Sequence, residues 1–303
     1  MPVSSDLKKF SKAFIIILVC IVLADFVIGS ALAHLYKIQS SGLLYRANYA
    51  KNVTTADYLV FGSSRANHHY DPKVFEQELN KSFYNCGRDA QGIIYTCAFT
   101  SSVINRYKPK GIIIDVRPNE FTITDKGTIA SLLPYKDDKL VSRYFEYNGP
   151  YENIKTLSHI YPYNSLLTNL LVGITSFNKK RTEDYKGYQA LKSVSKSKTL
   201  TEFAEHNEVD TAKVTYFKQL LTQLDKENIP TLVVISPLNY EYIDGPTVEI
   251  LKKECAGFKS IQFLNYAHDP LCKNPLNFSD KYHLNDKGAA IFSEMIVAKM
   301  RSL

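Results

Sequence analysis

The sequence lacks the residue patterns that mark metal and nucleic-acid sites. Its five cysteines form no Cys-x-x-Cys pair and no cluster with histidine, so we predict neither a metal nor another cofactor. The net charge of +7 (37 basic minus 30 acidic residues) comes from scattered lysines without an arginine-rich block, which argues against nucleic-acid binding. No internal repeat or low-complexity segment is present, and 45% of the 303 residues are hydrophobic, as in a globular protein.

The cysteines leave one question of pairing open. Cys20 lies in a long apolar stretch, whereas Cys255 and Cys272 stand on either side of an expected strand. In an oxidising compartment these two could form a disulfide, and two buried thiols fit the sequence equally well.

The long apolar stretch at residues 13–36 (AFIIILVCIVLADFVIGSALAHLY) predicts a transmembrane anchor, because it is long enough to cross a bilayer as one helix. Three lysines precede it within residues 8–12, and no comparable cluster follows. The positive-inside rule therefore places residues 1–12 in the cytoplasm and the rest of the chain outside it. We predict a single-pass protein of the cytoplasmic membrane whose folded domain is periplasmic or at the cell surface.

Two features of the stretch call for comment. Asp25 is costly in lipid, so it is expected to face a partner helix or to lie near the outer interface. Ala31-Leu32-Ala33 resembles a signal-peptidase site. We favour an uncleaved anchor over a cleaved signal peptide, because the apolar run extends past the usual signal-peptide core.

Beyond the anchor, residues 37–55 are polar and mixed, which predicts a stalk. From residue 56, apolar runs typical of strands occur at 58–61, 82–85, 111–116, 231–235 and 261–264. Helical patterns lie between or after them at 72–80, 89–107 and 285–300, with Asp71 and Asn285 or Asp286 as expected caps. This alternation predicts a three-layer α/β/α domain over residues 56–303 with about five parallel strands.

A tyrosine-rich stretch at residues 122–197 interrupts the alternation. It is expected either to pack on the edge of the domain or to form a lid or substrate wall over the site, since long insertions in α/β folds usually sit on the carboxyl-end face of the sheet. The sequence leaves both interpretations open.

The first candidate for chemistry is the Ser63-Ser64-Arg65 turn that follows the apolar run at 58–62. Gly62 lets the backbone turn sharply, and the serine hydroxyl would project from the carboxyl end of a strand, where open α/β sheets place their sites. Asp280 and His283 stand in one loop near the far end of the chain. Serine, histidine and aspartate are the groups that acyl transfer needs.

Four short blocks then appear in order along the chain. They are FGSSR at 61–65, NCG at 85–87, RPNE at 117–120 and DKYHL at 280–284. Each block follows an expected strand or lies in the last loop. This order resembles the SGNH (GDSL-like) hydrolase superfamily over about residues 56–121 and 231–303, and the resemblance implies its flavodoxin-like sheet.

The resemblance also implies a role for individual residues. Ser64 matches the nucleophile, His283 the base and Asp280 the acid that orients it. The backbone N–H groups of Ser64 and Gly87, with the carboxamide of Asn119, match the oxyanion hole.

The blocks depart from the family pattern at three points. Gly-Ser-Ser stands where Gly-Asp-Ser is usual, which leaves Ser63 as a rival nucleophile, although its position favours Ser64. Arg-Pro-Asn-Glu stands where Gly-x-Asn-Asp is usual. Gly87 is followed by Arg88-Asp89 and would equally suit the start of a helix.

Other histidines offer weaker candidates. His68 and His69 could line the pocket. We favour the other interpretation, a solvated pair of histidines at the start of a helix. His268-Asp269 is a rival to His283, and its spacing fits an edge loop better.

Membrane-anchored proteins that resemble this architecture are linked to O-acyl modification of envelope polysaccharides or teichoic acids, often beside a multi-pass membrane O-acyltransferase. The resemblance therefore implies an extracytoplasmic serine esterase or O-acyltransferase that acts on acylated envelope glycan, with such a membrane enzyme as partner. The altered blocks motivate an alternative, a catalytically silent glycan-binding or scaffold module. A lysophospholipase or thioesterase ranks third, because such an enzyme needs a broad apolar groove and the tyrosine-rich stretch at 122–197 is polar.

Overall fold

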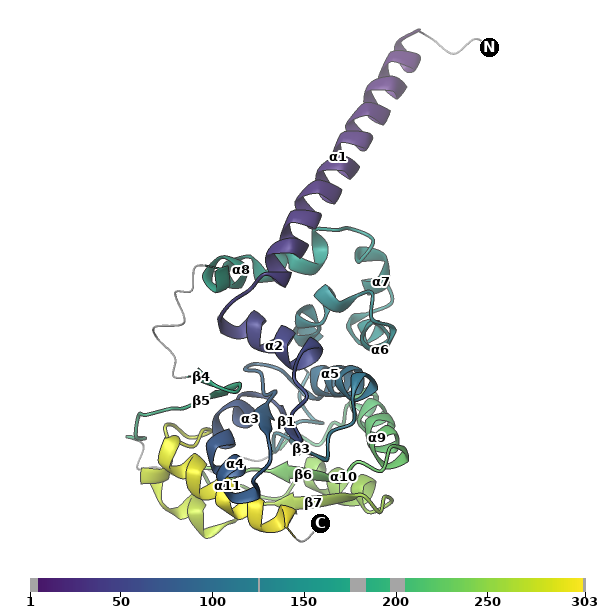
Figure 1. Cartoon of the computed structure of the whole chain (residues 1–303). Coiled ribbons are helices and arrows are strands. Elements are labelled where there is room, and N and C mark those ends of the chain that lie inside the picture. Colours follow the sequence, from purple (N-terminus) through teal and green to yellow (C-terminus); the bar gives the residue numbers. More distant parts are fainter. Residues whose placement is uncertain (1–4, 125, 175–183, 197–204, 302–303) are drawn as a thin grey trace.

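The computed structural model describes residues 5–124, 126–174, 184–196 and 205–301, and its centre is a sheet with helices on both faces (Figure 1). The strands are β1 (Tyr58–Gly62), β2 (Phe83–Asn85), β3 (Gly111–Asp115), β6 (Thr231–Ile235) and β7 (Ile261–Asn265). All neighbouring pairs are parallel, in the order β2-β1-β3-β6-β7. The expected α/β class and all five expected strands are confirmed.

The central strands are buried along their length, which explains why their sequences are continuous apolar runs such as GIIID and TLVVI. In the register of β1 with β3, Gly62 lies opposite Asp115. The carboxyl ends of these two strands are therefore neighbours, and the turns that follow them share one edge of the sheet.

Helices cover both faces of the sheet. The set α3 (Ser64–His69), α4 (Pro72–Leu79) and α11 (Asp286–Met300) shares a core with Val60 and Ile113. The set α5 (Ile93–Arg106), α9 (Thr211–Lys226) and α10 (Pro246–Cys255) shares a core with Phe61 and Ile114 on the other face. Asp71 caps α4 and Asn285 caps α11, as expected, whereas α5 begins four residues later than the pattern at 89–107 predicts.

The stretch at 122–197 forms a series of short elements. They are η1 (Lys126–Ser131), η2 (Leu133–Tyr135), α6 (Lys139–Ser142), η3 (Phe145–Asn148), α7 (Glu152–Lys155), η4 (Tyr161–Leu166), α8 (Leu167–Ile174) and the hairpin of β4 (Asp184–Tyr185) with β5 (Tyr188–Gln189). The helical part packs on α5 and reaches the amino-terminal helices. It thus lies between the sheet domain and the amino-terminal helix (Figure 1). Two further short helices, η6 (Pro270–Lys273) and η7 (Pro275–Asn277), precede α11.

Helix α1 (Ser5–Lys37) projects from the domain (Figure 1) and is long and apolar enough to cross a membrane. Helix α2 (Gly42–Asn52) occupies most of the range expected to be a stalk. Its residues Leu44, Ala47 and Ala50, three apart on one face, are buried in the main core, so this segment packs on the domain.

The cysteines of the described residues are all free. Cys255 is buried and Cys272 is partly buried. Of the two interpretations for this pair, the structure has the one with two thiols.

Candidate active site

Ser64 is the first residue of α3, directly after β1. Gly62 has a φ of +147°, and a side chain there would overlap the carbonyl oxygen of Asp115, so the sharp turn requires glycine. The hydroxyl of Ser63 is buried and caps α3 by accepting from the N–H of Arg65 at 3.4 Å. The hydroxyl of Ser64 instead lies 2.8 Å from Nε2 of His283, so Ser64 is the serine that meets the imidazole.

Asp280 holds the other side of the imidazole. Nδ1 of His283 lies 2.9 Å from Oδ2 of Asp280, and the N–H groups of Tyr282 and His283 donate to Oδ1 at 2.7 and 2.9 Å. Because a carboxylate accepts here, Nδ1 carries the ring proton and Nε2 is left to accept from Ser64. Burial alone would raise the pKa of Asp280, but these hydrogen bonds lower it below its usual value.

A cavity of about 260 Å³ opens beside this group. It is lined by Ser63, Ser64, Arg65, Arg117, Pro118, Asn119, Ile123, Tyr240, Tyr282 and His283. Within the described part of the chain, the carboxamide of Asn119 has no hydrogen-bond partner, so its N–H groups are available to a ligand in the cavity. Of the stretch at 122–197, Ile123 belongs to this lining. The role of that stretch as a lid stays a prediction.

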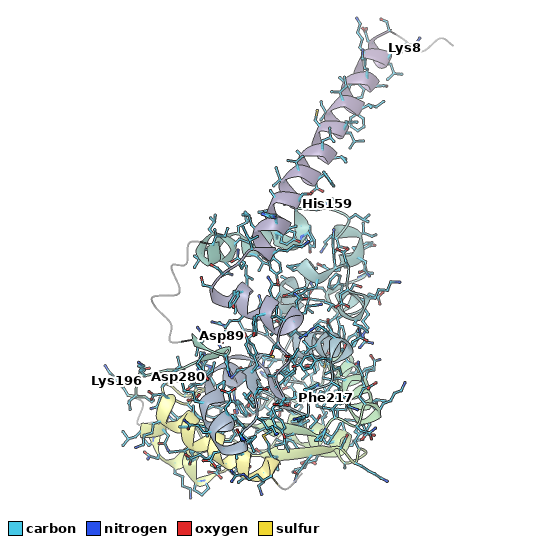
Figure 2. The ribbon with its side chains drawn as sticks, in the orientation of Figure 1. Lys8, Asp89, His159, Lys196, Phe217 and Asp280 are labelled. Atoms are coloured by element: carbon cyan, nitrogen blue, oxygen red, sulfur yellow. The ribbon has the colours of Figure 1, made fainter. Side chains whose placement is uncertain are left out.

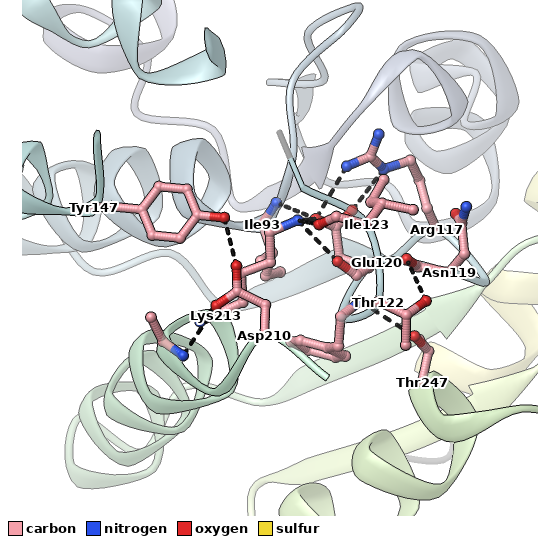
Figure 3. A network of polar contacts seen from close by, with 12 residues as sticks. Ile93, Arg117, Asn119, Glu120, Thr122, Ile123, Tyr147, Asp210, Lys213 and Thr247 are labelled. Carbon is pink, nitrogen blue, oxygen red and sulfur yellow. Dashed lines mark hydrogen bonds and ion pairs between the residues drawn. The ribbon is translucent and has the colours of Figure 1, made fainter. Parts of the chain in front are cut away.

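A buried ionic network fixes the turn that carries Asn119 (Figure 3). Glu120 accepts from Nε of Arg117 at 2.6 Å and from the N–H of Ile93 at 2.9 Å. Lys213 of α9, which is fully buried, donates to the carbonyl oxygens of Glu120 and Ile123, both at 2.9 Å. Burial opposes ionisation of Glu120, and the charges of Arg117 and Lys213 outweigh it and lower its pKa. The sequence offered no signal for the part played by Lys213.

Gly87 is placed differently from the expectation for an oxyanion donor. Its N–H donates to Oδ1 of Asn85 at 2.9 Å, and it is absent from the lining of the cavity that holds Ser64. A side chain at Gly87 would lie 2.3 Å from the backbone nitrogen of Asn67 in α3. The close approach of the two backbones therefore explains why residue 87 is a glycine. Gly87 does not start a helix, because α5 begins only at Ile93.

His69 joins the serine turn to the histidine loop, a link that sequence reasoning missed. Its Nε2 accepts from the N–H of Leu284 at 3.0 Å, and its Nδ1 donates to Oγ of Ser236 at 2.8 Å. The ring is fully buried, and this burial, with the charge of Arg65 nearby, holds the pKa of His69 well below its usual range. The expectation of a solvated His68-His69 pair is wrong, because both rings are buried in polar contacts.

Arg65 anchors the same cluster from α3. Its Nε donates to Oγ of Ser236 at 3.1 Å and lies 3.7 Å from Oδ1 of Asp115. Tyr70 donates to the other oxygen of Asp115 at 2.7 Å. Burial raises the pKa of Asp115, against the nearby charge of Arg65. These side chains fill the space beneath Ser64 with polar contacts, although Nη1 of Arg65 and Oδ1 of Asp115 are buried without a hydrogen-bond partner in the described part of the chain.

The remaining histidines do not take part in the serine contact. Nδ1 of His68 donates to the carbonyl oxygen of Gln189 at 2.6 Å, and its Nε2 lies 3.5 Å from Oδ1 of Asp89. His268 contacts Asp244 at 2.8 Å, and its side chain is more than half exposed. The rival pair His268-Asp269 is therefore not formed.

A larger cavity, of about 640 Å³, lies between α2 and β2, with Tyr45, Arg46, Tyr49 and Tyr84 in its wall. It contains neither Ser64 nor His283. The smaller cavity is the candidate active site, because Oγ of Ser64 and Nε2 of His283 share a hydrogen bond beside it. Among the residues that the structure describes, no group of three or more His, Cys, Asp or Glu could hold a metal ion.

Comparison with known proteins adds little. No family model and no curated protein matches the sequence. A proposed acylhydrolase from Bacteroides fragilis NCTC 9343 is similar in structure with a TM-score of 0.41 and 14% identity, over 86% of this chain and 94% of that one. A protein from Streptococcus pneumoniae described as a proposed platelet activating factor has a TM-score of 0.36 and 11% identity, over 95% of this chain and 99% of that one. Similarity at this level assigns the chain to no family.

Proposed function

We propose that the protein is an extracytoplasmic serine esterase or O-acyltransferase that acts on acylated glycan of the cell envelope. The observation that carries the proposal is the line of contacts from Oγ of Ser64 to Nε2 of His283 at 2.8 Å, and from Nδ1 of His283 to Asp280 at 2.9 Å. A serine hydroxyl becomes a useful nucleophile when a neutral imidazole takes its proton, and a carboxylate on the far nitrogen holds that imidazole in the required tautomer.

The chemistry follows from these positions. Oγ of Ser64 attacks the acyl carbonyl carbon while its proton moves to Nε2 of His283. The carbon–oxygen bond to the leaving alcohol then breaks, and His283 returns the proton to that alcohol. Water or a sugar hydroxyl next attacks the acyl carbon and gives its proton to His283. The bond from that carbon to Oγ of Ser64 then breaks, and His283 returns the proton to Oγ. Hydrolysis and transfer differ only in this second acceptor.

Two groups are suited to stabilise the oxyanion. The carboxamide of Asn119 lines the cavity, and the N–H of Ser64 belongs to the first turn of α3, where helix N–H groups lack an intrahelical acceptor. One such donor is typically worth about 2.7–4 kcal/mol of barrier stabilisation. Gly87 would join them only after its N–H leaves Asn85.

The glycan substrate and the compartment rest on other features. Helix α1 is suited to hold the domain at a membrane, and the lysines before residue 13 favour an extracytoplasmic domain. Tyr240 and Tyr282 line the cavity as an edge-to-face pair with ring centroids 5.8 Å apart, and the exposed ring of Tyr282 offers a sugar an apolar surface with a polar tip. An acyl donor delivered by a membrane O-acyltransferase would suit a tethered enzyme of this kind.

Labelling with a fluorophosphonate tests the proposal, because the probe reacts only with an activated serine. The wild-type protein and Ser63→Ala should be labelled, and Ser64→Ala should not. Labelling of Ser64→Ala but not of Ser63→Ala would show that the wrong serine was chosen. Release of p-nitrophenol from p-nitrophenyl acetate, with and without a glycan acceptor, would then separate transfer from hydrolysis.

The bond from the N–H of Gly87 to Asn85 favours one alternative, a catalytically silent module that binds envelope glycan. Such a module has no need of a complete oxyanion hole. It would stay unlabelled while folded, and Ser64→Ala would bind glycan as well as the wild-type protein does.

A further inference from the structure

The short helices beside α1 carry an exposed apolar surface that the proposed esterase chemistry does not use. Its members are Tyr151, Ile154, Leu157, Leu167 and Leu171, whose exposed fractions are 70, 61, 77, 47 and 65%. We call these five residues the apolar collar. They lie on α7, on the loop after it and on α8, which flank α1 where it meets the domain (Figure 1).

The collar segment carries little charge. Residues 150–174 contain one acidic residue, Glu152, and one lysine, Lys155, besides His159. Glu152 is buried and accepts from Lys155 at 3.1 Å and from Tyr161 at 2.5 Å. Large apolar side chains grouped in this way are unusual on a surface that faces water and suit the boundary of a bilayer. A lysine such as Lys155 can lie there with its apolar stem in the lipid and its ammonium group at the headgroups.

The same segment is fixed to α1 at Asp25. This carboxylate accepts from Oγ of Ser158 at 2.6 Å and from the N–H groups of His159 and Ile160 at 2.7 and 3.3 Å. One turn further along α1, a side chain at Gly29 would lie 2.3 Å from His159 (Figure 2 shows His159 beside α1). Asp25 therefore faces a loop of the domain, where the sequence led us to expect a partner helix or the interface.

The length of α1 decides where the bilayer surface lies. From residue 13 to Asp25 the helix rises about 18 Å at 1.5 Å per residue, whereas the hydrocarbon core is about 30 Å thick. About eight more residues, to roughly Ala33, must therefore lie within the core, and any tilt would require more of the helix. The loop bonded to Asp25 and packed on Gly29 lies inside that range.

We infer that the apolar collar inserts into the leaflet on the domain side of the membrane, so that the domain is partly embedded in lipid as well as anchored by α1. The inference rests on the proposed anchor role of α1. Its chemistry is consistent, because Asp25 is met by three donors and needs no water at that depth, and Tyr151 and Lys155 suit the interface.

Depth-dependent quenching tests the inference on the full-length protein in phosphatidylcholine vesicles. Cysteines are introduced at Leu157 and, separately, Leu171, in a Cys20→Ala background, and each carries the fluorophore NBD. Leu276→Cys is the matched control, since Leu276 is 59% exposed and lies on η7 next to α11, at the end of the molecule away from α1 (Figure 1). The protein without Cys20→Ala, labelled at Cys20, reports on α1 itself.

Lipids with a nitroxide on the acyl chain should quench the labels at 157, 171 and 20 strongly and leave 276 bright, whereas aqueous iodide should do the reverse. Quenching by lipid at 20 but not at 157 or 171 would overturn the inference and leave the anchor in place. Absence of quenching at 20 would remove the anchor, and the inference with it. Loss of labelling by fluorophosphonate would bear on the esterase proposal alone.

Discussion

The serine turn and the histidine loop meet at one hydrogen bond, but they are supported in opposite ways. Arg65 and His69, which follow Ser64 in α3, are almost fully buried among polar partners. The side chain of Asp280 is half exposed, and its loop is tied down through the backbone, from Leu284 to His69 and from Asn239 to the carbonyl oxygen of Lys281. Ser64 is thus held by the core, and His283 by a few separate hydrogen bonds of its loop. Changes that leave the fold intact should therefore alter activity most readily on the side of the base.

Removing either partner of that shared bond should have the largest effect. Ser64→Ala and His283→Ala should each lower kcat for p-nitrophenyl acetate by roughly a thousandfold or more, because the two groups act as a unit. The double variant should cost little more than either single one. Independent effects that multiply in the double variant would contradict a joint role, and Ser63→Ala is the matched control with mild loss.

Asn119→Ala should rank next, with a fall in kcat of about 10²–10³ from the loss of one oxyanion donor. KM should change little, because the donor acts on charge that develops in the transition state. Steady-state kinetics separate the two constants. A rise in KM at constant kcat would place Asn119 in substrate binding instead.

His69→Leu tests the link between the two sides. It leaves the buried N–H of Leu284 without its acceptor, a loss of about 1–3 kcal/mol. If this loss falls on the transition state through a shift of the loop, kcat should drop by roughly 5- to 150-fold. His69→Gln retains an acceptor and should restore part of the activity. If both variants lower Tm equally while kcat stays at the wild-type value, His69 supports the fold and not the position of His283.

Asp280→Asn should lower kcat and leave partial activity, because the Asn oxygen can still accept from the N–H groups of Tyr282 and His283, while its NH₂ opposes Nδ1–H and disfavours the tautomer that His283 needs. The lowered pKa of Asp280 keeps the wild-type carboxylate ionised below its ordinary value of about 3.9. Protonation of Asp280 itself should therefore remove the advantage of the wild type over the variant only below about pH 4, and NMR titration of the Asp280 carboxyl in the wild-type protein measures this. A titration midpoint of that carboxyl between pH 7 and pH 5 would contradict the lowered pKa.

The strands and the positions of the candidate site residues could be predicted because their signals are local. A strand buried on both faces is a short apolar run, and the residues after it fall at the edge of the sheet. Ser64 and Asn119 follow β1 and β3 in this way, whereas Asp280 and His283 lie in the loop before α11. The structure brings Ser64, Asp280 and His283 into contact and Asn119 into the same cavity.

The supporting residues could not be predicted, because their partners are distant in sequence. Lys213 reaches a carbonyl 93 residues away, and His69 accepts from an N–H 215 residues away. The hydrogen bond from the N–H of Gly87 to Asn85 is local in the sequence. A glycine near the end of a strand nevertheless gives the same sequence pattern whether its N–H is free or already hydrogen-bonded. Helix α2 was missed because its buried residues, Leu44, Arg46, Ala47 and Ala50, include a charged side chain and form no clear apolar stripe in a segment of mixed composition.

The join between α1 and the domain has a mechanical consequence. In the short link after α1, Nε2 of Gln39 donates to the carbonyl oxygen of Leu170 at 3.2 Å, and Oγ of Ser41 donates to that of Gly173 at 3.2 Å. These bonds and the contacts of Asp25 fix the orientation of α1 relative to the domain. With α1 in a bilayer, the mouth of the cavity at Ser64 would therefore keep a constant distance from the membrane surface and a constant orientation. The protein would then select its targets by their distance from the membrane as well as by their chemistry, and it would act on an acyl group only where the polymer passes at that distance.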